Sequence, residues 1–157
     1  MKVTLMAVGR TQSPLMRQGI DMYLDRLGHY LPVEVKIIDD VKVGKSASRD
    51  QQKQLEGAAI LRLLAPSDRV VLLDEKGREF TSREFADSVQ RHMSAGVKRL
   101  VYVVGGPFGF SPDVYARADA KLSLSRMTFS HEMVRLFFAE QLYRAMTILR
   151  GENYHHD

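Results

Sequence analysis

The chain has 157 residues, a formal net charge of +4 and no cysteine. Its balance of 45% hydrophobic and 27% charged residues is typical of a soluble globular protein, and the length fits one domain, residues 1–157. The lack of cysteine excludes disulfides, thiolate metal sites and cysteine nucleophiles. No apolar run approaches the roughly 20 residues that cross a bilayer, and the first residues do not form a signal peptide. We therefore expect a cytoplasmic protein without a membrane segment, whose mild positive charge favours a polyanionic partner.

Five runs of residues predict strands, with helical segments between them. The runs are 2–8, 33–39, 69–74, 99–104 and 120–124. The third and fourth are almost continuous stretches of Val and Leu, which is typical of parallel strands covered on both faces. Strands that alternate with helices predict an α/β fold with a mainly parallel sheet flanked by helices.

Capping residues mark the starts of three helices. Ser48 and Thr81 each begin a capping box, and Ser111 precedes a proline in the first helical turn. The last helix shows an apolar stripe at helical spacing, formed by Val134, Phe138, Leu142, Ala145 and Leu149. These signals are local, so they predict where helices begin without saying how the helices pack.

Two turns that follow strands differ from ordinary connections. The sequence GGPFG at 105–109 follows a buried run directly, and the segment 122–130 gathers small and polar side chains ahead of the last helix. Glycine allows the backbone to come close to a ligand. An isolated Gly-Gly-Pro is more often only a tight turn, but two such loops within one βα unit indicate a single ligand site. Pro107 and Phe108 exclude the fingerprint of a dinucleotide-binding fold.

Five ordered motifs together resemble one family. They are VLLDEKG at 71–77, VVGGPFG at 103–109, SLSRMTFSHEMVR at 123–135, AEQLYRA at 139–145 and RGENYHH at 150–156. Over its whole length the chain is similar to the small SPOUT-superfamily methyltransferases that methylate N3 of a pseudouridine in 23S ribosomal RNA, the ribosomal RNA large subunit methyltransferase H family. It departs from the usual family pattern at Phe108, where a less bulky or acidic residue is common, and at Ser130, where proline is common.

The resemblance implies an S-adenosyl-L-methionine-dependent methyltransferase that acts on ribosomal RNA, on the assembled ribosome, as a homodimer. It also implies a trefoil knot near the C-terminus, within a cofactor-binding region of about 70–150. The cofactor-binding residues that it implies are Leu73, Gly105, Leu124, Ser125, Arg126, Met127, Thr128 and Phe129. Their apolar members suit adenine, which needs an apolar slot with backbone donors and acceptors. Such a ligand is expected outside the carboxyl ends of the strands.

His131 and Arg135 are the candidate catalytic residues. The positive end of the last helix favours a neutral His131 imidazole that can accept a proton, although the residue could equally cap or position the loop. Arg135, one turn further on, could pair with a carboxylate or an RNA phosphate. We expect no metal site, because His131, His155 and His156 do not lie on one rigid element and no H-E-x-x-H motif is present.

The C-terminal tail supplies the candidate substrate-binding residues, Arg150, Tyr154 and His155. An aromatic ring beside basic groups suits an unstacked base, although a frayed terminus is an equally simple interpretation. Leu136, Phe137 and Tyr143 lie off the apolar stripe of the last helix, and we expect a second subunit to bury some of them.

Two other functions remain open from the sequence. One is a related knotted enzyme that methylates transfer RNA. The other is a non-catalytic ribosome-binding protein that shares the fold but does not bind S-adenosyl-L-methionine.

Overall fold

A computed structural model describes residues 1–157, with five strands and five helices. In chain order they are β1 (Lys2–Val8), α1 (Pro14–Leu27), β2 (Val33–Ile38), α2 (Arg49–Arg62), β3 (Arg69–Glu79), α3 (Ser82–Ser94), β4 (Arg99–Val104), α4 (Pro112–Arg117), β5 (Ala120–Ser123) and α5 (His131–Arg150). All five predicted strands are confirmed, although β2 and β5 each end one residue early. None of the helices combines the length and apolar character that a membrane crossing requires.

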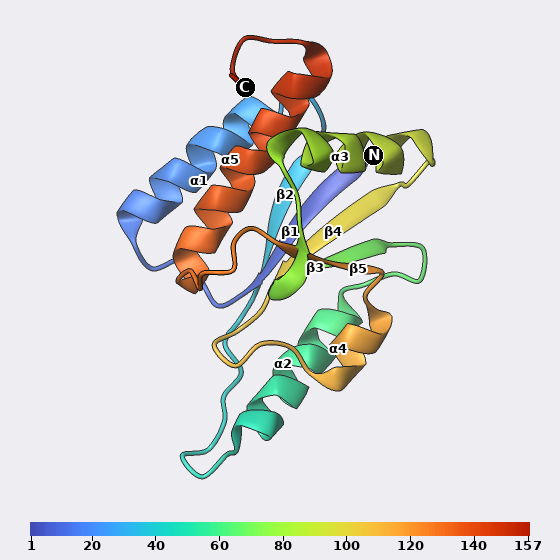
Figure 1. Cartoon of the computed structure of the whole chain (residues 1–157). Coiled ribbons are helices and arrows are strands. Elements are labelled where there is room, and N and C mark those ends of the chain that lie inside the picture. Colours follow the sequence, from blue (N-terminus) through green and yellow to red (C-terminus); the bar gives the residue numbers. More distant parts are fainter.

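The five strands form one parallel sheet in the order β2-β1-β4-β3-β5. Helices α1, α3 and α5 cover one face of the sheet, and α2 and α4 cover the other (Figure 1). The predicted α/β class with a parallel sheet and flanking helices is therefore confirmed. The central strand β4 is buried almost throughout, as expected for a strand with helices on both sides.

Strand β3 is longer than predicted because it pairs with β5 twice. The pairing is interrupted after Leu73 and resumes at Arg78, so the residues between them leave the sheet as an irregularity. Gly77 lies so close to β5 that an added Cβ would come within 2.7 Å of the Leu122 backbone. The detour places polar residues beside the carboxyl end of β5.

The predicted helix starts are all confirmed. Ser48 and Thr81 each form a complete capping box, and the Ser111 side chain accepts a hydrogen bond from the amide of Val114. Each cap satisfies amides that a helix leaves unpaired at its start.

Side chains of successive strand residues point into two separate cores. Leu5 and Tyr102 pack beneath Phe138 of α5, whereas Met6 and Val103 pack towards α2 and α4. The apolar stripe of α5 lies in the first core, where Phe138, Leu142 and Ala145 are buried. Burying a side chain of this size contributes about 1.5–3 kcal/mol, so the two cores hold the sheet rigid beneath the loops at its edge.

Candidate functional site

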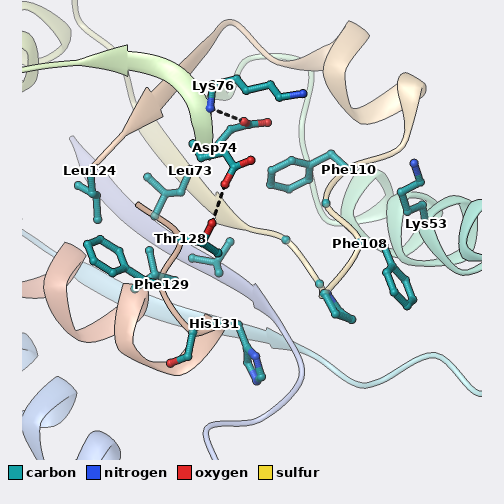
Figure 2. A pocket seen from close by; sticks show the side chains of 18 of the residues that line it. Lys53, Leu73, Asp74, Lys76, Phe108, Phe110, Leu124, Thr128, Phe129 and His131 are labelled. Carbon is teal, nitrogen blue, oxygen red and sulfur yellow. Dashed lines mark hydrogen bonds between the residues drawn. The ribbon is translucent and has the colours of Figure 1, made fainter. Parts of the chain in front are cut away.

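A pocket of about 820 Å³ lies at the carboxyl edge of the sheet, where the irregular part of β3 and the loops after β4 and β5 meet the start of α5 (Figure 2). Its volume falls in the range of small-molecule sites. Most of the expected cofactor-binding residues line it, namely Leu73, Gly105, Leu124, Ser125, Met127, Thr128 and Phe129. The fold thus brings these expected residues to one site, although the first and last of them, Leu73 and Phe129, are 56 residues apart in the sequence.

Arg126 is the exception among the expected cofactor-binding residues. It does not line the pocket, and its side chain is 87% exposed beside Glu79, with 3.5 Å between Nε and Oε1. An exposed ion pair of this kind contributes little to stability. The Arg126 side chain therefore points away from the ligand site that its neighbours line.

The turn after β4 is closed by a hydrogen bond from the Gly109 amide to the Gly106 carbonyl at 3.1 Å. A Cβ on Gly105 would lie 3.1 Å from the ring of Phe110, and one on Gly106 would overlap the buried carboxylate of Glu56. Packing on both sides of the turn therefore favours glycine at both positions. A ligand that approaches the backbone would favour it as well.

The loop after β5 is organised by its own polar side chains. The Ser123 hydroxyl donates to the Ser125 carbonyl at 2.8 Å, and the Ser125 hydroxyl accepts from the Met127 amide at 3.0 Å. The Thr128 hydroxyl donates to the Glu75 carboxylate at 2.9 Å (Figure 2). These hydrogen bonds thus fix the conformation of the polar loop and connect it to Glu75 of β3.

Sequence reasoning missed the acidic side of the pocket, which is formed by Asp74 and Glu75. The Asp74 carboxylate accepts from the Lys76 amide at 2.8 Å and from the Tyr115 hydroxyl. Burial, followed by the hydrogen bond to Asp74, raises the pKa of Tyr115 to about 12, so this phenol remains a donor at neutral pH. Two acidic residues directly after a buried strand were a signal that could have identified this wall.

Helix α2 also contributes to the pocket, which no local pattern predicted. Arg49 and Lys53, from its first two turns, line the side that faces Phe108. Basic residues in a capped helix usually form a solvated face, so only the packing of α2 beside the turn after β4 shows their position.

His131 lies at the rim of the pocket as the first residue of α5. The side chain of Ser130 caps the helix by accepting from the Met133 amide at 3.2 Å, so His131 is not the cap. Its imidazole is exposed and makes no hydrogen bond within the chain. Of the two candidate catalytic residues, His131 is the one that reaches the site.

Arg135 occupies a different environment from the one expected. It is 1% exposed, and its guanidinium donates to the carbonyls of Val8 and Gly9 at 2.9 and 2.8 Å and to the Thr11 hydroxyl at 3.0 Å. Burial lowers its pKa from the usual value. The expected contact with a carboxylate or an RNA phosphate is therefore corrected: Arg135 ties α5 to the end of β1 and has no surface from which to contact RNA.

The tail is docked on its own chain. The Tyr154 hydroxyl donates to Glu140 at 2.9 Å, and the guanidinium of Arg144 lies over the Tyr154 ring, 4.8 Å from its centroid. The Nδ1 atom of His155 is 3.3 Å from Nη1 of the same arginine. A frayed end is thus the wrong interpretation of residues 154–155.

The pocket lies at the start of α5, and the tail leaves the end of this helix but folds back along it. The Tyr154 hydroxyl reaches Glu140, nine residues after His131, which is about 14 Å along the helix axis. None of Arg150, Tyr154 and His155 lines the pocket. No group of three or more potential ligands is placed to hold a metal ion.

Of the three residues from which a second subunit was expected to bury some, one remains exposed. Leu136 packs against Gly19 of α1, and Tyr143 packs against Tyr23, Tyr30 and Tyr154, so both are covered within the chain. Phe137 remains 38% exposed. Three other large apolar side chains on the same two helices are also exposed, namely Leu15 and Met22 on α1 and Met133 on α5.

Comparison with known proteins identifies relatives over the whole length of the chain. A family model described as a predicted SPOUT methyltransferase matches residues 1–155. A protein of Porphyromonas gingivalis named ribosomal RNA large subunit methyltransferase H is 54% identical over 157 residues, which is 100% of both chains. Proteins with the same name from Christiangramia forsetii and Bacteroides thetaiotaomicron are 53% identical over 156 residues, 99% of both chains, and 51% identical over 157 residues, 100% of both.

Proposed function

Because the chain belongs to the SPOUT methyltransferase family, we propose that it transfers a methyl group from S-adenosyl-L-methionine to N3 of a pseudouridine in 23S ribosomal RNA. The observation that carries this proposal is the pocket at the carboxyl edge of the sheet, which brings the irregular part of β3 and the loops after β4 and β5 around one volume. The names of the full-length relatives support ribosomal RNA of the large subunit as the substrate. The net charge of +4 agrees with a polyanionic substrate.

The residues of the pocket fit S-adenosyl-L-methionine. Leu73 and Leu124 lie on the same side of the pocket as Phe129 and offer an apolar slot for adenine (Figure 2). The carboxylates of Asp74 and Glu75 suit a ligand that carries positive charge. When bound, the cofactor would supply a methyl group on a sulfonium, whose leaving group needs no protonation.

The protein's main task in such a transfer is alignment. Bringing two reactants together in the right geometry can supply about 7–11 kcal/mol of the barrier. The hydrogen bond between Thr128 and Glu75 and the closed turn at 106–109 make the pocket walls rigid enough for this task. Rigid loops on a buried sheet are what an alignment mechanism requires.

One proton must also be removed. Methyl transfer to N3 would leave this nitrogen with a proton to lose, and the bound cofactor would depart with the electron pair of its bond to the methyl group. We assign the acceptor role to His131, because its exposed imidazole stands at the rim of the pocket with no competing hydrogen bond. Arg135 is not assigned a chemical step, because it is buried behind the helix.

We further propose that the enzyme is a homodimer in which each pocket is served by the tail of the other subunit. This arrangement is supported by the position of the tail, none of whose residues lines the pocket of its own chain. The exposed apolar side chains of Leu15, Met22, Met133 and Phe137 supply a surface for the second subunit. Arg150, Tyr154 and His155 would then hold the target nucleotide from the partner's side.

The trefoil knot is part of the same proposal. The chain leaves β5 at one edge of the sheet and returns across the strand ends to begin α5, which packs against both α1 and α3 (Figure 1). This return passes through the region of the pocket, so a knot there would hold the cofactor loops against each other without any disulfide.

The proposal is tested with ribosomes from a strain that lacks this gene. The purified protein and labelled S-adenosyl-L-methionine should add one methyl group per ribosome, and mass spectrometry of 23S ribosomal RNA digests should assign it to N3 of a pseudouridine. Transfer RNA from the same strain serves as the competing substrate. Methylation of transfer RNA in place of ribosomes would contradict the assigned substrate, and absence of cofactor binding in calorimetry would indicate a non-catalytic ribosome-binding protein.

A further inference from the structure

We infer that Phe108 is a substrate-positioning residue on which an RNA base stacks at the mouth of the pocket. This inference rests on the proposed function, because it assigns a contact to the RNA substrate of the same site.

The backbone presents Phe108 at the corner of a closed turn. The hydrogen bond between Gly106 and Gly109 fixes the two ends, and Pro107 restricts the φ angle just before Phe108. Gly109 adopts a φ of +81°, which completes the turn without strain. The turn therefore fixes the backbone from which the Phe108 ring projects.

Phe108 is exposed where a large apolar side chain would ordinarily be covered. It is 38% exposed, whereas Phe110, two residues on, is 6% exposed and belongs to the core beneath the pocket. The two neighbouring rings thus have different roles. Phe110 supports the turn from inside, whereas the Phe108 ring lies at the side of the pocket next to Lys53 (Figure 2).

One basic group contacts the exposed ring and a second lies nearby. The guanidinium of Arg49 lies over the Phe108 ring, 5.1 Å from its centroid, and Lys53, which is 3.4 Å from the Asp50 carboxylate, lines the pocket as well. Aromatic rings beside Arg and Lys are the recurring platform for unpaired nucleic-acid bases, since the ring stacks on the base and the cations attract its phosphate.

The position of Phe108 favours the RNA as its ligand over the cofactor. The apolar slot formed by Leu73, Leu124 and Phe129 lies on the other side of the pocket (Figure 2). His131, at the rim, lies between that slot and Phe108 in this view. A base that stacks on Phe108 would therefore approach from the open side and share the rim with His131.

Fluorescence tests the stacking directly, because the chain contains no tryptophan. Phe108→Trp introduces a single reporter, and a stacked base quenches indole emission. The matched control is Phe80→Trp, because Phe80 also lies under a guanidinium, that of Arg78, but does not line the pocket. The probes are a single-stranded RNA that contains pseudouridine and an abasic oligonucleotide of the same length.

The expected result is that the RNA quenches the Phe108→Trp variant at least threefold more strongly than the abasic oligonucleotide does, and does not quench the Phe80→Trp variant. Equal effects of the two oligonucleotides on the Phe108→Trp variant, or no quenching while the RNA is shown to be bound, would overturn the inference. The fluorescence measurement does not require methylation, so it tests base stacking on Phe108 even if the proposed function is wrong.

Methylation of ribosomes by Phe108 variants then tests whether base stacking on this residue contributes to the reaction. Phe108→Ala and Phe108→Leu should each raise the ribosome concentration at half-maximal single-turnover rate at least tenfold, and Phe108→Tyr should rescue most of that loss by restoring an aromatic face. The calorimetric affinity for S-adenosyl-L-methionine should change less than twofold in all three. If Phe108→Leu behaves as the unmodified protein, apolar bulk alone suffices and the stacking role is wrong, while methylation by the unmodified protein leaves the proposed function intact.

Discussion

Thr128 and Glu75 are joined by a hydrogen bond of 2.9 Å that links the loop after β5 to the end of β3. The residues are 53 positions apart, and the bond closes one wall of the pocket. Thr128→Val keeps the shape and removes the donor, so we expect cofactor affinity to fall about 2- to 10-fold, as the loss of about 0.5–1.5 kcal/mol implies. Calorimetric titration measures it.

A double-mutant cycle supplies the control for this bond. If Thr128 acts through Glu75, Thr128→Val should have little further effect in a Glu75→Gln background, because the interaction has already been weakened. Independent, additive losses would mean that the two residues contact the ligand separately.

Gly105→Val should weaken cofactor binding at least tenfold, or about 1.4 kcal/mol. An added Cβ would lie 3.1 Å from the Phe110 ring, and the further methyl groups must extend into the ring or the pocket. Gly44→Val is the matched control, because nothing lies within 4 Å of a Cβ at that position. Circular dichroism checks folding, and unchanged affinity in a folded Gly105→Val protein would falsify this placement of the ligand.

Arg135→Met should reduce the free energy of unfolding by about 2–4 kcal/mol, because it leaves the buried carbonyls of Val8 and Gly9 without a donor. Urea denaturation measures the loss. Arg126→Met removes the same charge from an exposed position and should change stability by less than about 0.5 kcal/mol. If the Arg135→Met protein had normal stability but did not methylate ribosomes, Arg135 would instead act in catalysis.

Glu56 predicts a pH dependence of stability. Its side chain is buried beside Gly106, one carboxylate oxygen accepts from Gln52 at 3.0 Å, and the other has no partner. Burial raises the pKa of this carboxyl group in the folded protein. The folded state then binds the proton more tightly than the unfolded state, so the free energy of unfolding falls as the pH rises from the unfolded pKa through the folded one.

Glu56→Gln removes this ionisation and keeps an acceptor for Gln52. The variant should match the unmodified protein near pH 4 and be more stable than it at pH 8, as measured by urea denaturation of both at each pH. All other titrating groups are common to the two proteins, so their effects cancel. An equal difference in stability at both pH values would show that the Glu56 charge is not the cause.

The elements of the fold could be predicted because their signals are local. The caps at Ser48, Thr81 and Ser111 satisfy amides within three residues, and the runs of Val and Leu in β3 and β4 reflect burial on both faces. The extension of β3 to Glu79 could not be predicted in this way. It depends on a second pairing with β5, which a polar and glycine-containing segment does not reveal.

The site was predictable where one loop supplies several residues and not where distant segments meet. Residues 124–129 were identified as a unit, whereas Arg49 reaches the pocket only because α2 packs beside the turn after β4. The environment of Arg135 was missed for the same reason, since its acceptors Val8 and Gly9 lie 127 and 126 residues away. Spacing along a helix shows which residues share a face and not which partner covers that face.

Subunit complementation tests whether the tail acts on the partner's pocket. One variant lacks residues 153–157 and keeps its pocket, and the other carries Gly105→Val and keeps its tail. At a cofactor concentration too low to fill the Gly105→Val pocket, each alone should show little methylation of ribosomes. After subunit exchange at equal concentrations, half of the dimers are mixed, and each mixed dimer has one intact pocket facing one intact tail. Roughly a quarter of the wild-type activity should therefore return.

The alternative arrangement gives the opposite result, because a tail that served its own pocket would leave no complete site in any mixed dimer. Native mass spectrometry confirms that mixed dimers have formed, since the two chains differ in mass. Mixed dimers without activity would rule out the shared site. The contacts of Tyr154 with Glu140 and Arg144 would then only stabilise the C-terminal end of the chain. Residues that line the pocket, such as Phe108 and His131, would have to hold the base.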